Sequence, residues 1–127
     1  ACGGILGEAL QAAERLQQQG VSTRVLSMHT IKPIDREALA AAARETGGIV
    51  TIEEHTVDGG LGSAAAETLL ETGSVPGFFR RIGLRGRFAS CVGSQDYLRT
   101  VYQLDQDAIV SEVLSALKGG SRLAIAA

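Results

Sequence analysis

Ile49-Val50-Thr51-Ile52 is the stretch that decides the fold, together with the glycine-rich turn Asp58-Gly59-Gly60-Leu61-Gly62 that follows it. The apolar run has no alternating polar residues, which is typical of a strand covered on both faces in a parallel sheet. After the turn, apolar residues recur at helical spacing from Leu61 to Leu69. A covered strand, a tight turn and a helix in this order favour an α/β fold.

Segments on both sides of this unit repeat the alternation of strand and helix. The predicted strands are 21–28, 49–52 and 79–84. Helices are expected to begin near Ile5, Arg36, Leu61, Ser94 and Asp105, and Gly20, Gly47 and Gly73 are expected stops. Strands that alternate with helices predict a three-layer α/β/α sandwich with a mostly parallel sheet.

Three strands make a thin sheet for this number of helices. The first helix begins almost at Ala1, whereas a strand precedes other helices of the pattern. We therefore expect the sheet to lack its first strand in this chain, and the natural polypeptide to continue upstream. The predicted domain covers residues 1–118, and residues 119–127 have no periodicity and are expected to form a loose tail.

Composition excludes several classes of protein. The chain has 127 residues, 45% of them hydrophobic, and a formal net charge of −2, which argues against disorder. No apolar run approaches the roughly 18 residues of a membrane span, and no basic stretch offers a surface for nucleic acid or an anionic membrane. No secretory signal is visible, so Cys2 and Cys91 are expected to be free thiols in a cytoplasmic protein.

The densest polar group, Glu53-Glu54-His55, follows the strand 49–52 and precedes the glycine-rich turn. Ligands of open α/β sheets bind beyond the carboxyl ends of strands, and a helix N-terminus attracts anions. The candidate residues are Glu54, His55, Gly59, Gly60 and Gly62. Three interpretations stay open: a small-anion site, acid/base chemistry by Glu54 and His55, or a structural role in which the carboxylates cap N–H groups and His55 joins an interface.

The remaining polar residues give weaker signals. His29 follows the first predicted strand, but two histidines do not define a metal site. The only basic cluster is expected to be solvated, to pair with carboxylates across an interface, or to meet a phosphate, and it consists of Arg80, Arg81, Arg85 and Arg87. No Ser–His–Asp or Cys–His arrangement can be assembled, so no catalytic or metal-binding residue is predicted.

Six motifs follow one another along the chain: Thr30-Ile31-Lys32-Pro33-Ile34-Asp35, Thr51-Ile52-Glu53-Glu54-His55, Gly59-Gly60-Leu61-Gly62-Ser63, Arg81-Ile82-Gly83-Leu84, Arg87-Phe88 and Tyr102-Gln103-Leu104. Their order resembles the C-terminal domain of transketolase-like thiamine diphosphate enzymes. Related domains occur in 1-deoxy-D-xylulose-5-phosphate synthase and in the β chain of 2-oxo acid dehydrogenases. The resemblance covers residues 1–117, and its glutamates and Lys-Pro-Ile-Asp segment look most like bacterial transketolases.

The resemblance implies a parent enzyme that transfers two-carbon ketol units between sugar phosphates. In that family, other domains hold the thiamine diphosphate, its Mg²⁺ and the activating glutamate. The resemblance therefore implies that this domain binds no cofactor, is inactive alone, and serves assembly with other transketolase domains or a partner subunit, with a homodimer expected. The alternatives are a regulatory module that binds a phosphate-like effector at residues 54–62, and the corresponding domain of a 2-oxo acid dehydrogenase β chain.

Overall fold

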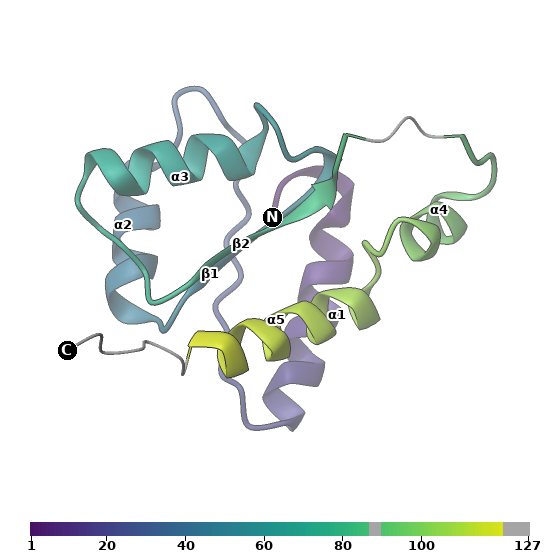
Figure 1. Ribbon diagram of the computed structural model, residues 1–127, viewed down its shortest axis with the longest axis horizontal. Coiled ribbons are helices and arrows are strands. Elements are labelled where there is room, and N and C mark those ends of the chain that lie inside the picture. The colour runs from purple at the N-terminus through teal and green to yellow at the C-terminus, as the bar shows by residue number, and fades with distance from the viewer. Residues whose placement is uncertain (87–89, 121–127) are drawn as a thin grey trace.

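The computed structural model describes residues 1–86 and 90–120 of the chain. Its helices and strands alternate along most of the sequence (Figure 1). In chain order they are the 3₁₀ helix Gly3–Ile5, α1 (Leu6–Gln18), α2 (Arg36–Glu45), β1 (Ile49–Thr56), α3 (Leu61–Glu71), β2 (Phe79–Leu84), α4 (Gln95–Val101) and α5 (Gln106–Gly120).

The sheet is parallel, as predicted. Strands β1 and β2 lie side by side in a register that pairs Ile49 with Phe79 and Ile52 with Ile82. Figure 1 shows α2 and α3 on one side of the two strands, and α1 and α5 on the other. The α/β class with a parallel sheet between two helical layers is confirmed.

Each helical layer builds its own apolar core against the sheet. On one side, Ile5 of the 3₁₀ helix is 0% exposed, and Leu16 in the apolar stripe of α1 is 2% exposed. This stripe packs with Ile109 and Val110 of α5. On the other side, small residues of α2 and α3 pack with Leu39, Leu61 and Leu69. Alanines on the inner helix faces allow helix and sheet to approach closely with few aromatic residues.

Side chains just before three of the helices cap their first N–H groups. The Asp35 and Asp105 carboxylates accept hydrogen bonds from the N–H groups of Ala38 and Ala108, at 2.9 Å and 3.0 Å. Ser94 caps α4 in the same way. These contacts satisfy N–H groups that have no partner within their own helix.

Two boundaries differ from the predictions. The strand predicted over 49–52 continues to Thr56, which pairs with Leu84 after an irregularity in the register between Ile52 and Thr56. Helix α5 extends to Gly120, two residues beyond the predicted end of the domain at 118. The rest of the predicted tail, residues 121–127, and the Arg87-Phe88 motif lie outside the described residues.

The prediction of a strand over 21–28 is wrong. This segment contains no assigned strand, and its ladder hydrogen bonds are limited to those that Leu26 and Met28 form with Ala1. Figure 1 draws the segment as a coil that passes the two strands without joining them. The apolar, β-branched composition is that of a strand, but no other strand in the described part of the chain lies beside it to complete a ladder.

Candidate functional site

The Glu53 carboxylate closes the amino-terminal end of α3. Its oxygens accept hydrogen bonds from the backbone N–H groups of Leu61 and Gly62, at 2.8 Å and 2.9 Å. Glu53 is 1% exposed. The first N–H groups of a helix lack intrahelical partners and carry partial positive charge, so a carboxylate is stabilised there. Glu53 thus occupies the helix end at which a small-anion site is one of the three predicted interpretations.

Glycines in the turn give this carboxylate its room. A Cβ atom at Gly60 would overlap Glu53 Oε2, and one at Gly62 would lie 2.8 Å from Thr51 Oγ1. Gly59 has φ +79°, a backbone conformation that side chains disfavour. Gly60 and Gly62 are buried, whereas Gly59 is exposed. The two buried glycines therefore shape a contact within the protein.

Glu54 serves a different part of the molecule, because neighbouring residues of a strand point to opposite faces. Its carboxylate accepts a 2.7 Å hydrogen bond from Arg99 Nε and a 3.1 Å bond from Gln95 Nε2. Arg99 also lies 3.6 Å from a Glu8 oxygen and donates to the carbonyl of Gly4 at 3.1 Å. One guanidinium therefore ties α4 to β1 and to the beginning of α1.

The Arg99–Glu54 pair is partly shielded from water. The side chains of Arg99 and Glu54 are 12% and 27% exposed. The hydrogen bond to Glu54 raises the pKa of the Arg99 guanidinium further above its ordinary value. The Arg99 guanidinium therefore stays charged and holds Glu54, while His55 lies on the opposite face of β1.

The two histidines stand apart from these contacts. His55 is exposed, and its Nδ1 atom lies 3.1 Å from the carbonyl oxygen of Thr56. His29 is also exposed. Across residues 1–86 and 90–120, no group of three or more His, Cys, Asp or Glu side chains could hold a metal ion.

The arginines in β2 and directly after it have separate partners within the protein. Arg81 donates to the carbonyl of Val57 at 2.8 Å, and Arg80 lies 3.7 Å from Glu112. Arg85 donates to the carbonyl of Arg81. Arg87 lies outside the described residues. The three described arginines therefore do not converge on one common anion site.

Sequence reasoning missed Arg99 and Gln95, which hold Glu54. They lie more than 40 residues from Glu54 along the chain, and the only local signal is the i,i+3 spacing of Asp96 and Arg99. A short polar helix offers no periodic apolar stripe that would reveal the face it presents to the protein.

The comparison with family models decides the family. Residues 1–109 match the model described as "Transketolase, C-terminal domain". The chain belongs to the transketolase C-terminal domain family. The resemblance noted in the sequence motifs is thereby confirmed.

This transketolase C-terminal domain has relatives in several longer proteins. It is 48% identical over 110 residues to the 6-deoxy-6-sulfo-D-fructose transketolase subunit SqwH of Clostridium sp. (strain MSTE9), a match that covers 87% of the chain and 33% of that protein. It is 38% identical over 113 residues to 1-deoxy-D-xylulose-5-phosphate synthase 1 of Geobacter sulfurreducens, covering 87% of the chain and 18% of that protein. The chain thus spans about a third or less of these relatives' length.

A solved structure shares the fold of the transketolase C-terminal domain. This "Split gene transketolase, inactive beta4 tetramer" superimposes with a TM-score of 0.83 at 40% sequence identity. The match covers 92% of the present chain and 37% of the other. The similarity therefore extends over most of the helices and strands described above.

Transketolase-family enzymes depend on thiamine diphosphate. A diphosphate requires unoccupied N–H groups or cations, and its Mg²⁺ requires oxygen ligands. Here Glu53 fills the end of α3 with negative charge, and Arg99 is engaged by Glu54. These residues therefore do not fit the cofactor.

Among the helices that the structure describes, none combines the length and apolar character needed to cross a membrane.

Proposed function

We propose that this chain is the assembly domain of a thiamine diphosphate-dependent transketolase. The parent enzyme transfers a two-carbon ketol unit between sugar phosphates, and the cofactor is held by its other domains. The family match and the short span of the chain relative to its relatives support this division of labour. On this proposal the domain alone has no ketol-transferase activity.

The observation that carries the proposal is the exposed apolar surface around α4. Helix α4 contains no buried residue, and Val92, Tyr97 and Val101 are 98%, 53% and 41% exposed. Tyr97 and Val101 are four residues apart and therefore share one face of the helix. Apolar groups gathered on an exposed surface mark a site of protein–protein contact. We call Val92, Tyr97 and Val101 the α4 surface.

The α4 surface is held in place by charge. Arg99, on the same helix, reaches the Glu54 and Glu8 carboxylates. Because ion pairs fix this helix while its apolar side chains stay exposed, we infer that a partner protein covers these side chains. The proposed partner is a second copy of the chain in a homodimer, or another transketolase domain or subunit. The similar solved structure is described as a tetramer, which supports association of this kind.

The candidate residues of the sequence analysis receive interface roles in this proposal. Glu54 positions α4 through Arg99, while His55 and Gly59 are exposed near the turn and available to a partner. Gly60 and Gly62 leave room for the Glu53 carboxylate and for Thr51. All five residues then support assembly indirectly or at the rim of a contact.

Analytical ultracentrifugation over a wide concentration range tests the assembly role. We expect the wild-type chain to dimerise reversibly, and the double variant Tyr97→Ser, Val101→Ser to remain monomeric with unchanged circular dichroism. Leu70→Ser is the matched control, because Leu70 is 72% exposed on α3 and lies outside the α4 surface. A wild-type chain that is monomeric throughout, or a double variant that dimerises normally, would contradict the proposed self-association.

Activity measurements test the other half of the proposal. The purified chain, supplied with thiamine diphosphate, Mg²⁺ and a ketose phosphate donor with an aldose phosphate acceptor, is expected to show no ketol transfer. Calorimetry is expected to show no heat of thiamine diphosphate binding. Turnover by the chain alone would contradict the proposal.

An effector role for the turn is the second candidate. It is suggested by the exposed N-terminal side of the turn at Asp58 and Gly59, but it requires an anion to compete with the Glu53 carboxylate. Titration with inorganic phosphate, followed by NMR, distinguishes the two roles. Saturable shifts of the amide signals from Gly59 to Ser63 would support an effector site, and unchanged signals at millimolar phosphate would count against it.

A further inference from the structure

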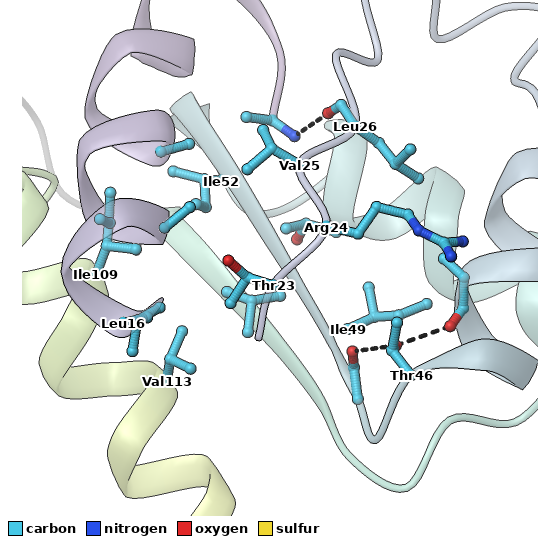
Figure 2. A pocket seen from close by; sticks show the side chains of 18 of the residues that line it. Leu16, Thr23, Arg24, Val25, Leu26, Thr46, Ile49, Ile52, Ile109 and Val113 are labelled. Atoms are coloured by element: carbon cyan, nitrogen blue, oxygen red, sulfur yellow. Dashed lines mark hydrogen bonds between the residues drawn. The ribbon is translucent and has the colours of Figure 1, made fainter. Parts of the chain in front are cut away.

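The two strands of the sheet differ in what lies beyond their outer edges. Beyond β1 lies the segment 21–28, and Figure 2 shows Val25 of this segment and Ile52 of β1 in the lining of one cavity. Strand β2 is the last strand on its own side of the two-stranded sheet. In the described part of the chain, no backbone pairs with the outer edge of β2. We call this outer edge the β2 edge.

Alternate residues supply the backbone groups of the β2 edge. The Ile49 N–H of β1 donates to the Phe78 carbonyl at 2.9 Å. A parallel strand bonds to a given neighbour through every second residue, so the even-numbered residues of β2 bond towards β1. The N–H and carbonyl groups of Arg81 and Gly83 therefore face outward. They are the donors and acceptors that another strand would use.

A guanidinium already occupies one acceptor of the β2 edge. Arg85 Nη2 donates to the Arg81 carbonyl at 3.1 Å. Arg80 lies 3.7 Å from a carboxylate oxygen of Glu112, whereas Arg85 has no ion pair within residues 1–86 and 90–120. Arg85 is also exposed. This cation is thus held by a neutral carbonyl and is available to a carboxylate.

A groove along the β2 edge leaves room for another strand. Its volume is ≈ 490 Å³. One wall is residues 81–85, and the opposite wall includes Gln103 at the end of α4 and Ala108 and Ser111 of α5. Strands lie about 4.8 Å apart, rise about 3.3 Å per residue and form layers about 10 Å thick, so the groove holds roughly three residues of extended chain.

Pairing at a sheet edge is a general way to bind a peptide. Main-chain hydrogen bonds give the affinity, and alternate side chains give the specificity. Strand β2 has six residues, Phe79–Leu84, with no proline, which is about the usual length of a strand. Charged side chains commonly guard such edges. Here the guard is Arg85, which a suitable side chain can draw away.

The charges around the groove select the occupant. A second copy of the chain would bring its own Arg80, Arg81 and Arg85 against the same three arginines, and like charges at a contact disfavour it. An extended segment with a carboxylate would instead meet Arg85. Hydrogen bonds between a guanidinium and a carboxylate are stronger than those to a neutral carbonyl, so Arg85 would exchange the Arg81 carbonyl for the carboxylate. The Arg81 carbonyl would then accept a bond from the incoming backbone.

We propose that the β2 edge binds an extended segment of a partner protein that carries a carboxylate side chain, and that Arg85 selects this segment. The backbone of the segment bonds to Arg81 and Gly83, and its carboxylate binds the Arg85 guanidinium. The inference depends neither on the proposed assembly through the α4 surface nor on ketol transfer.

Synthetic peptides and the whole isotope-labelled chain test the proposal. The first peptide is acetyl-Thr-Val-Glu-Val-Thr-amide, which is about the length of a strand. The second and third peptides have Gln or Lys in place of Glu. The fourth keeps Glu but carries methyl groups on its central backbone nitrogens, which removes its ladder donors. Hydrogen exchange is followed at the Arg81 and Gly83 amides, with the Ile82 amide, on the β1 side, as the internal reference.

The peptide with Glu is expected to slow exchange of the Arg81 and Gly83 amides about tenfold at a concentration of about ten times its Kd, and to leave Ile82 unchanged. The peptide with Gln should bind about fivefold more weakly, since it lacks an ion pair with Arg85. The peptides with Lys or with methylated nitrogens should give no protection. Protection by either of these two, or none by the Glu peptide at millimolar concentration, would overturn the proposal.

The variant Arg85→Gln tests the selecting residue. It should bind the peptides with Glu and Gln equally. Arg44→Gln is the matched control, because Arg44 is also exposed but lies at the end of α2, and it should keep the fivefold preference for Glu. A preference that survives in Arg85→Gln would overturn the role of Arg85.

A second copy of the chain is distinguished without any peptide. Protection of the Arg81 and Gly83 amides that grows with protein concentration would assign the β2 edge to self-association. That result would overturn the proposed occupant. Exchange that is independent of protein concentration, together with protection by the Glu peptide, is the outcome we expect.

Discussion

Replacement of Glu53 by glutamine tests the central contact between β1 and α3. The variant Glu53→Gln keeps nearly the same shape but removes the charge. Glutamine can accept from only one of the Leu61 and Gly62 N–H groups, and its own NH₂ group then faces the other. We therefore expect a well-packed but destabilised domain.

The size of the effect follows from the geometry. Glu53 is 1% exposed and accepts two bonds of 2.8 Å and 2.9 Å. A hydrogen bond to a charged group contributes about 1.5–3 kcal/mol, and an unsatisfied buried N–H costs a similar amount. The charge at a helix N-terminus adds about 1 kcal/mol. Since the remaining oxygen keeps one bond, we expect the free energy of unfolding to fall by about 2–4 kcal/mol.

Urea unfolding and hydrogen exchange measure the two parts of this prediction. The midpoint should fall with little change in the m value, and the Leu61 and Gly62 amides should exchange faster relative to later amides of α3. Glu67→Gln is the control, because Glu67 is an exposed residue of the same helix and its replacement should change stability by less than about 0.5 kcal/mol. A loss in Glu53→Gln as small as that of the control, or unchanged exchange at Leu61 and Gly62, would refute the reasoning.

Three further predictions follow from contacts of the same region. Gly60→Ala should lower the free energy of unfolding by about 3 kcal/mol, because its Cβ atom would overlap Glu53. The double variant Gly60→Ala, Glu53→Gln should lose clearly less than the sum of the two single losses, and urea unfolding that shows additive losses would refute the contact. Arg99→Met should lower the free energy of unfolding by about 1–3 kcal/mol, because it leaves the Glu54 and Glu8 carboxylates without their cation. Arg24→Met, which breaks a half-exposed ion pair with Glu45, should lower it by less than about 0.5 kcal/mol. Burial and the nearby Glu53 carboxylate raise the pKa of the Cys2 thiol, so at mildly alkaline pH Cys2 has less thiolate than an ordinary cysteine. Mass spectrometry should show that iodoacetamide modifies Cys2 more slowly than a model peptide thiol until the pH is raised. Equal rates would contradict this prediction.

Much of the fold is visible in local sequence patterns. The stripe of α1, the caps Asp35, Ser94 and Asp105, and the strand at 79–84 depend on residues within a few positions of one another. Local spacing fixes such features because helices and caps are made of short-range hydrogen bonds. The order of these elements then leads to a parallel sheet.

The failure at 21–28 has a different origin. Val21, Val25 and Leu26 have the composition of a strand, but a strand becomes part of a ladder only when another backbone lies alongside. In the described residues, the backbone of this segment bonds to Ala1 at Leu26 and Met28 and to the end of α1 at Val21, and to no strand. The composition of a segment indicates that it is buried, but it does not indicate whether another strand lies beside it.

For a similar reason, the sequence predicts only part of the candidate site. The sequence predicts a helix N-terminus that attracts negative charge, and it includes a capping carboxylate among the open interpretations. It does not reveal that Glu53, eight residues before Leu61, supplies this charge, because the reach depends on how the turn folds back over β1. Nor does it reveal Arg99, whose link to Glu54 spans 45 positions.

The adjacency of Glu53 and Glu54 has a consequence for how β1 is aligned. Consecutive strand residues point to opposite faces, so one carboxylate meets the α3 amides while the next meets Arg99. A slip of β1 by one residue towards its beginning would bring Glu54 to the amides and exposed His55 to the guanidinium, where two cationic or N–H-bearing groups would face each other. The contacts of the two glutamates on opposite faces therefore fix the register of β1. The largely uniform apolar run at 49–52 could not specify this register by itself.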